Sequence, residues 1–144
     1  MAHTPFRGKI PTDRLYDTRY DMWVQRAGER VVVGVTSFGV FLAGELIAFT
    51  AKPRGAQVEL GRGIGTVESS KTVMAVHSPL SLLVDEINEV AEEHPRVINT
   101  DPYVAGWMVR GRPLAWENER AALVNARDYI AHVKAMEPDA AIEQ

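Results

Sequence analysis

The sequence predicts a mainly β fold with short helices and one C-terminal amphipathic helix, and two patterns carry this prediction. Glycines and prolines recur at short intervals between Pro53 and Gly65, which favours short strands joined by tight turns over long helices. Over residues 116–136, apolar residues are instead spaced three, four and seven apart, as on one face of a helix. We expect this helix to be the only long one and to close one side of the sheets.

Local signals predict the elements that come before this helix. The apolar runs on either side of Gly28 predict a hairpin. Thr36 or Ser37 can cap a short helix that Gly44 ends, and Asn88 can cap a second one. Strands are predicted over residues 45–50, 80–87 and 107–112.

Length and charge indicate one domain that acts without nucleic acid or membrane. Residues 1–15 mix prolines, a glycine and charges, so we expect an extended arm outside the core, followed by a single domain over residues 16–144. The 16 Lys and Arg against 19 Asp and Glu give a net charge of −3, which favours neither nucleic acid nor membrane as a partner. Because no long apolar run or signal-peptide pattern occurs, we expect a cytoplasmic protein.

The residue types exclude several kinds of chemistry. The chain has no cysteine, so any sulfur chemistry must come from a bound group or a partner. Its four histidines are scattered without the spacing of ligands, and we predict no metal site. No nucleophile lies beside a base, so we expect no catalytic residues and a chain that serves as a substrate of enzymes.

Lys71 is the residue that the pattern presents most clearly. It lies between two short β-like stretches, with Ser69 and Ser70 at the bend, and this arrangement predicts the tip of a hairpin. An amine on a four-carbon stem at such a tip is suited to acylation by another enzyme. An ordinary solvated lysine in a turn explains the same pattern.

Acidic residues gather in a second segment, between the predicted strand 80–87 and Pro95. They form either a solvated face or a docking patch for a basic partner. The residues are Asp85, Glu86, Glu89, Glu92 and Glu93.

Two segments resemble the glycine cleavage system H-protein family. Residues 58–73, with Glu68 three positions before Lys71, are similar to the family's lipoyl-attachment segment. Downstream, the Asn-x-Asp-Pro-Tyr run that begins at Asn99 and the Gly-Trp pair at Gly106 follow the family's order and spacing. The resemblance covers about residues 16–113.

The resemblance implies a flattened two-sheet barrel or sandwich of the lipoyl and biotinyl carrier type. It also implies a carrier, not an enzyme, with lipoic acid joined to Lys71 as an amide by a lipoate-protein ligase. Glu68 and Gly65 match family residues of the attachment hairpin and are candidates for its recognition. A strand-end glutamate that aids solubility and a plain turn glycine are the alternative interpretations of these two residues.

Departures from the family pattern bear on the cargo. Asp21, Met22 and Trp23 stand where the family has His-Glu-Trp, against which the arm loaded with an aminomethyl group can fold back. Leu82 stands where the family has glycine, and residues 49–53 replace its Val-Glu-Leu-Pro segment. These changes resemble the H-like lipoate-binding proteins of sulfur-oxidising prokaryotes.

Three functions are therefore considered. The leading one is a lipoyl-lysine swinging arm that carries sulfur intermediates for a heterodisulfide-reductase-like complex. The alternative is a glycine cleavage H protein that carries the aminomethyl group among glycine decarboxylase, aminomethyltransferase and dihydrolipoamide dehydrogenase. The third is an unlipoylated binding module with the same fold.

Overall fold

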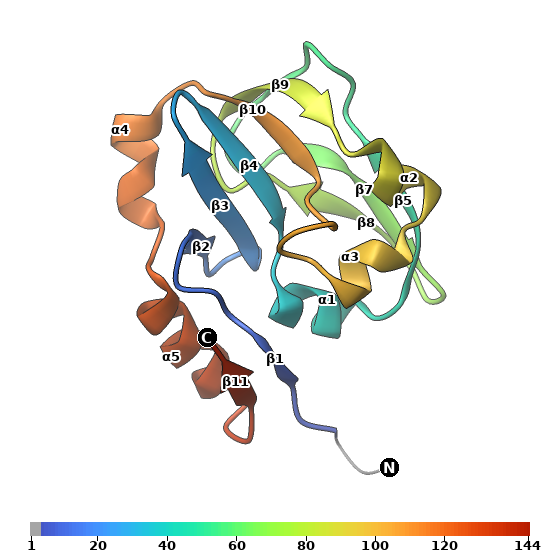
Figure 1. The fold of residues 1–144 in the computed structure, drawn as a ribbon, viewed down its shortest axis with the longest axis vertical. Coiled ribbons are helices and arrows are strands. Elements are labelled where there is room, and N and C mark those ends of the chain that lie inside the picture. The colour runs from blue at the N-terminus through green and yellow to red at the C-terminus, as the bar shows by residue number, and fades with distance from the viewer. Residues whose placement is uncertain (1–3) are drawn as a thin grey trace.

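The structure is a computed structural model that describes residues 4–144, and over that range it places the strands in three sheets (Figure 1). His3 and the start of the predicted arm lie outside the described residues. The strands are β1 (Arg7–Lys9), β2 (Leu15–Asp17), β3 (Met22–Ala27), β4 (Arg30–Val35), β5 (Leu46–Ala51), β6 (Gln57–Val58), β7 (Gly63–Ser69), β8 (Val73–His77), β9 (Leu82–Ile87), β10 (Val109–Pro113) and β11 (Ala141–Glu143). The helices are α1 (Ser37–Ala43), α2 (Glu89–Glu93), α3 (Arg96–Thr100), α4 (Trp116–Glu119), the 3-10 turn η1 (Arg120–Ala122) and α5 (Ala126–Met136).

Two sheets enclose the main core, which confirms the predicted sandwich. One has six strands in the order β2-β3-β4-β10-β9-β6, and the other has three in the order β5-β7-β8. Apolar side chains from both, such as Val33 and Val84 from the first and Ile64 from the second, are fully buried in one cluster. Burial of this apolar surface is the main stabilising contribution to the fold. No helix within residues 4–144 is long and apolar enough to cross a membrane.

The local turn and cap signals are confirmed. The hairpin of β3 and β4 turns at Gly28, whose φ of 65° lies in the left-handed region that glycine adopts without strain. The Thr36 side chain accepts a hydrogen bond from the Gly39 amide and caps α1, and Asn88 caps α2 in the same way.

The short helices α2 and α3 cover the free edge of β5. The Ala51 amide donates to the Glu92 carboxylate at 2.9 Å, and the Leu46 amide donates to the Asn99 side-chain oxygen at 2.9 Å. The other end of the Asn99 amide donates to the Gly44 carbonyl. Because these side chains occupy backbone donors at the edge, they reduce pairing of β5 with another chain.

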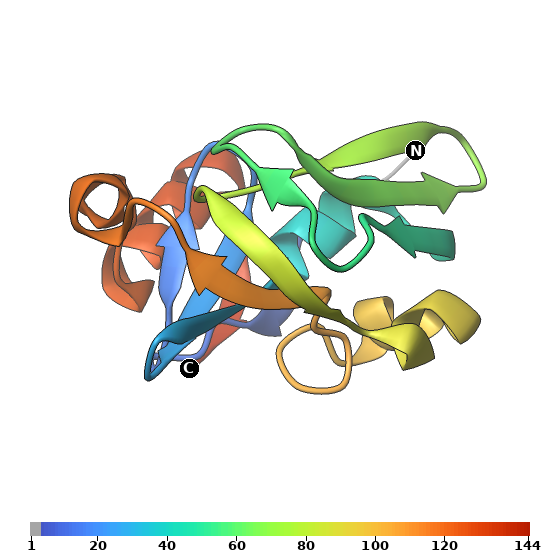
Figure 2. The same cartoon turned by 90° about the horizontal axis from the view of Figure 1, so that it is seen from above.

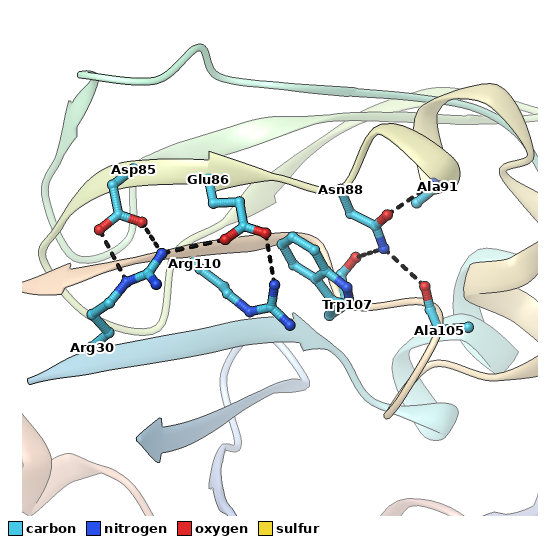
Figure 3. Close-up of polar contacts among 8 residues, drawn as sticks. All are labelled: Arg30, Asp85, Glu86, Asn88, Ala91, Ala105, Trp107 and Arg110. Atoms are coloured by element: carbon cyan, nitrogen blue, oxygen red, sulfur yellow. Dashed lines mark hydrogen bonds and ion pairs between the residues drawn. The ribbon is translucent and has the colours of Figure 1, made fainter. Parts of the chain in front are cut away.

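Much of the acidic segment is paired within the molecule (Figure 3). Arg30 on β4 donates to Asp85 and Glu86, and Arg110 on β10 donates to Glu86 at 2.7 Å. The Arg110 guanidinium also lies 4.0 Å above the Trp107 ring. These arginines neutralise two members of the cluster, which counts against a wholly free acidic docking patch.

The N-terminal segment contributes to the core, contrary to the expectation of an arm outside it. Phe6 and Ile10 are buried in a second apolar cluster with Tyr16, Trp23 and Tyr129. Between them, β1 pairs in parallel with β11, so the segments near both ends of the chain lie side by side (Figure 1). Two large apolar side chains at a spacing of four residues outweigh the breaking effect of the prolines and glycine.

The predicted helix over residues 116–136 is wrong as a single element. The structure has α4 and η1, then an extended break, and then α5. In the break, Val124 exchanges both backbone hydrogen bonds with Tyr16 of β2, which leaves these groups unable to join a helix. The Asn125 side chain then accepts from the Asp128 amide and starts α5 anew. α5 buries Ala126, Tyr129 and Val133, so the amphipathic character is confirmed for this part.

Candidate functional site

Lys71 lies in the turn between β7 and β8, as the sequence predicts. The turn is closed by the Ser69 amide, which donates to the Thr72 carbonyl at 2.9 Å, while the Lys71 amide donates to the Ser69 hydroxyl at 3.3 Å. Ser69 is buried and Lys71 is exposed, so the backbone is fixed while the side chain reaches solvent. In Figure 2 this hairpin, in green, extends away from α4 and α5 on the opposite side of the molecule.

The Lys71 ammonium has no hydrogen bond or ion pair to any of residues 4–144. Glu68, the penultimate residue of β7, is also exposed and pairs in register with Val73 across the hairpin and with Ala48 on β5. A carboxylate and an amine are therefore presented near one another at the same end of the sheet. An incoming enzyme can reach both without unfolding any part of the chain.

Gly65 lies towards the base of the hairpin and is buried. A Cβ atom there would lie 2.5 Å from the Thr50 carbonyl oxygen and 3.0 Å from the Ala51 Cα on the neighbouring strand. Only glycine allows β5 and β7 to approach this closely. The packing accounts for this residue, and a part in recognition of the hairpin stays a prediction.

A groove of about 370 Å³ runs beside β8, between this strand, α1 and the start of β3. Its walls are mostly apolar. The groove residue Met74 is the second residue of β8, three positions after Lys71. The lining residues include Asp21, Met22, Leu42, Leu46, Met74 and His77.

Asp21 is held at this groove by a chain of hydroxyl groups. The Tyr129 hydroxyl donates to an Asp21 carboxylate oxygen at 2.8 Å, and the Thr36 hydroxyl lies 2.7 Å from the same tyrosine oxygen. Since the tyrosine proton points to the carboxylate, Thr36 is the donor in the second bond. The Asp21 backbone has a φ of 56°, which aspartate tolerates better than most residues.

The surroundings of Asp21 raise the pKa of its carboxyl above the ordinary value. Burial raises the pKa of the Asp21 carboxyl, and the hydrogen bond from Tyr129 and the nearby His132 oppose the increase. The His132 Nε2 atom lies 3.7 Å from the same carboxylate oxygen and is buried without a hydrogen-bond partner among the described residues. Burial also raises the pKa of Tyr129, so its hydroxyl stays protonated and remains a donor.

Sequence reasoning located Lys71 and Glu68 but missed most of the groove. Asp21 and Met22 were noted only as departures from a family pattern, and Tyr129 and His132 were not singled out. Their contact with the groove depends on α5 folding back against β3, and no local motif indicates that. Among residues 4–144, no three His, Asp or Glu side chains are grouped closely enough to hold a metal ion.

Comparisons with known proteins agree with this geometry. Residues 14–136 match the family described as Glycine cleavage H-protein. The chain is 36% identical over 129 residues to the glycine cleavage system H protein of Anaeromyxobacter sp., covering 90% of this chain and 99% of that one. It is 34% identical to glycine cleavage system H protein 5 of Aquifex aeolicus, with 82% of each chain covered.

A solved structure gives the same result. The crystal structure of a glycine cleavage system H protein from Mycobacterium marinum superposes with a TM-score of 0.76 at 34% identity, covering 85% of this chain and 97% of that one. Proteins of this family are carrier subunits that hold lipoate covalently on a lysine, and they are not enzymes themselves. The chain belongs to the glycine cleavage H-protein family.

Proposed function

We propose that Lys71 is the lysine that carries lipoate and that the chain is the carrier of a glycine cleavage system. The observation that carries the proposal is an exposed ammonium without a partner among residues 4–144, on a turn whose backbone is closed by hydrogen bonds. A lipoate-protein ligase would join the activated lipoyl carboxyl to the deprotonated Nζ amine. The amide C–N bond forms as the bond from the lipoyl carbonyl carbon to its activating group breaks, the activating group leaves, and the nitrogen gives up a further proton. Glu68 is proposed to help the ligase select this lysine.

The residues around Lys71 suit a long acyl arm. When bound, the lipoyl group supplies a redox-active pair of sulfurs, which a chain without cysteine cannot supply itself. The groove beside β8 is an apolar surface that starts near the attachment point and can shelter an arm from water. A tethered group reaches each partner at high effective concentration, so docking of the partners can be weak.

The experiment is an exchange assay. The lipoylated chain is mixed with glycine decarboxylase, and exchange of labelled bicarbonate into the glycine carboxyl is measured. We expect exchange with the chain and none with a Lys71→Arg variant, which keeps the positive charge. A wild-type chain that gains lipoate but supports no exchange would contradict the glycine cleavage role and leave the carrier role standing.

Sulfur transfer is the second candidate, and one observation favours it. Met22, Met74 and Met108 all line the groove, and their polarizable thioethers give a soft, uncharged surface that suits a sulfur-bearing cargo. On this proposal, a heterodisulfide-reductase-like complex is the partner. The names of the related proteins favour the glycine cleavage role instead. The sulfur role is tested by measuring the thiosulfate-dependent reduction of an electron acceptor by such a complex, with and without the lipoylated chain.

A further inference from the structure

We propose that the outer face of the β5-β7-β8 sheet, around Ile47 and Val73, is an apolar docking surface for the lipoate-protein ligase that acts on Lys71. This inference rests on the proposed function, because the ligase is the enzyme proposed to modify that lysine. It adds a contact surface of named residues to the attachment point that Lys71 and Glu68 form.

Register across the three strands determines which side chains share this outer face. The residues between them in sequence, such as Phe49 and Val67, point inward and are buried between the two sheets. Ala48 is half-buried and the other outer-face side chains are exposed, so no element within residues 4–144 covers this face. The outer face consists of the row Ala48, Glu68 and Val73 and the next row Thr50, Thr66 and Ala75.

Ile47 joins the outer face because β5 carries a bulge. The register between β5 and β7 shifts between Leu46 and Ala48, which leaves Ile47 as the extra residue. A bulge changes the direction in which a side chain points. Ile47 is accordingly 57% exposed, although its neighbour Leu46 is buried in the core.

The apolar side chains of this face gather at its Lys71 end. Val73 follows Lys71 by two residues and is 63% exposed. Ile47 lies at the same end, since its neighbour Ala48 pairs with Glu68 on β7. A contiguous apolar patch marks an interaction surface, whereas isolated exposed apolar residues do not.

The composition of the face defines the surface that fits it. Glu68 is the only charged side chain of the outer face, and the others are apolar or threonine. A complementary partner therefore presents an apolar surface with one basic group opposite Glu68.

Reach determines which enzyme contacts this face. The ligase has to bring its activated lipoyl carboxyl to Nζ, which is joined to the Lys71 backbone only by a four-carbon stem. Its surface therefore has to lie against the hairpin. Once the arm is attached, the reacting sulfurs are at its far end, so an enzyme that acts on them needs no contact with the outer face.

Strand propensity alone makes a different prediction for the two residues. Valine and isoleucine favour strands, and on that account their exposure serves no partner. Threonine is also β-branched and favours strands, but it carries a hydroxyl in place of a methyl. Val73→Thr and Ile47→Thr therefore keep the strand preference and remove part of the apolar surface.

The experiment measures the kinetics of lipoylation by a lipoate-protein ligase, followed by intact mass at several concentrations of the chain. Because burial of an apolar side chain is lost from the complex, each threonine variant should lower kcat/KM about tenfold through a higher KM. Val73→Ile, which keeps the apolar surface, should retain the wild-type value. The matched control is Val104→Thr, which changes a side chain that is 70% exposed and lies outside the three sheets.

Two further measurements separate docking from indirect effects. The N-hydroxysuccinimide ester of lipoic acid should acylate Lys71 at the same rate in wild type and both threonine variants, because a small reagent needs no docking surface. Variants that have been fully lipoylated by long incubation should support bicarbonate exchange with glycine decarboxylase at the wild-type rate.

Wild-type kcat/KM in both threonine variants, or an equal loss in Val104→Thr, would overturn the proposal. An equal loss of exchange in the lipoylated variants would overturn the assignment of this face to the ligase. A wild-type chain that gains no lipoate would defeat the proposed function and this inference with it. Equal lipoylation of wild type and both threonine variants would defeat only the inference.

Discussion

The Tyr129 hydroxyl donates a 2.8 Å hydrogen bond to the Asp21 carboxylate, although 108 residues separate the two in sequence. The bond joins α5 to the residue that precedes β3. Through Thr36, which bonds the same tyrosine and caps α1, it also reaches the helix that forms one wall of the groove. The C-terminal helix therefore supports the groove wall without lining the groove itself.

Removal of this hydroxyl should destabilise the fold and raise the Asp21 pKa further. The bond from Tyr129 lowers that pKa against the effect of burial, so Tyr129→Phe leaves desolvation less opposed. A buried acceptor that loses its donor costs about 1–3 kcal/mol. Urea denaturation gives the stability, and NMR titration of the Asp21 carboxyl carbon gives the pKa. An unchanged pKa in the variant would contradict the assigned bond.

The sign of the Asp21 effect on stability follows from its raised pKa. The folded state holds the proton more tightly than the unfolded state, whose pKa is close to 3.8, so ionisation of Asp21 costs stability. The free energy of unfolding of Asp21→Asn, relative to that of wild type, should therefore increase as the pH rises from 3.8 through the folded-state pKa of Asp21. Above that pKa, the difference between the two proteins should be constant. Denaturation midpoints measured across this range check the sign, and a difference that falls as the pH rises would refute it.

Gly65→Ala should destabilise the chain by about 1–3 kcal/mol, the usual cost of forcing an extra carbon into a packed site. The added Cβ would lie 2.5 Å from the Thr50 backbone oxygen, which cannot move without disturbing β5. Gly63→Ala in the same strand is the matched control, because its nearest neighbour is 3.7 Å away. The midpoint temperature of thermal unfolding should be clearly lower for Gly65→Ala than for Gly63→Ala. Equal midpoints would show that the β5 backbone shifts to accommodate the added carbon.

The cap of α5 should be worth about 1 kcal/mol. Asn125→Ala removes the oxygen that accepts the Asp128 amide proton, and this loss should lower the free energy of unfolding by that amount. Asn118→Ala in α4 is the control, since Asn118 is an exposed residue within that helix and not its N-cap. Urea denaturation measures both variants. A loss for Asn118→Ala as large as that for Asn125→Ala would argue against the cap.

Sequence gave reliable predictions where a signal is local. The turn at Gly28, the cap at Thr36 and the hairpin tip at Lys71 each depend on residues a few positions apart, and all three are found in the structure. The family pattern then placed these elements in a sandwich, which the topology confirms.

The misses all involve long-range contacts. The helix breaks at Val124 because the Val124 backbone forms hydrogen bonds with Tyr16. The apolar spacing of residues 116–136 does not indicate this pairing. The local sequence around Phe6 and Ile10 is typical of a frayed end. Their burial becomes evident only once β1 is paired with β11. The groove likewise needs β8, α1 and β3 together, so a single residue such as Asp21 gives no signal of its burial.

The central claim is that Lys71 is the point of attachment, and intact mass spectrometry tests it most directly. The chain is incubated or co-expressed with a lipoate-protein ligase, alongside Lys71→Arg and a control in which the other mid-chain lysine is changed, Lys52→Arg. Wild type and Lys52→Arg should each gain the mass of one lipoyl group, and Lys71→Arg should gain none. A lipoyl group on Lys71→Arg, or no gain on the folded wild-type chain, would contradict the account.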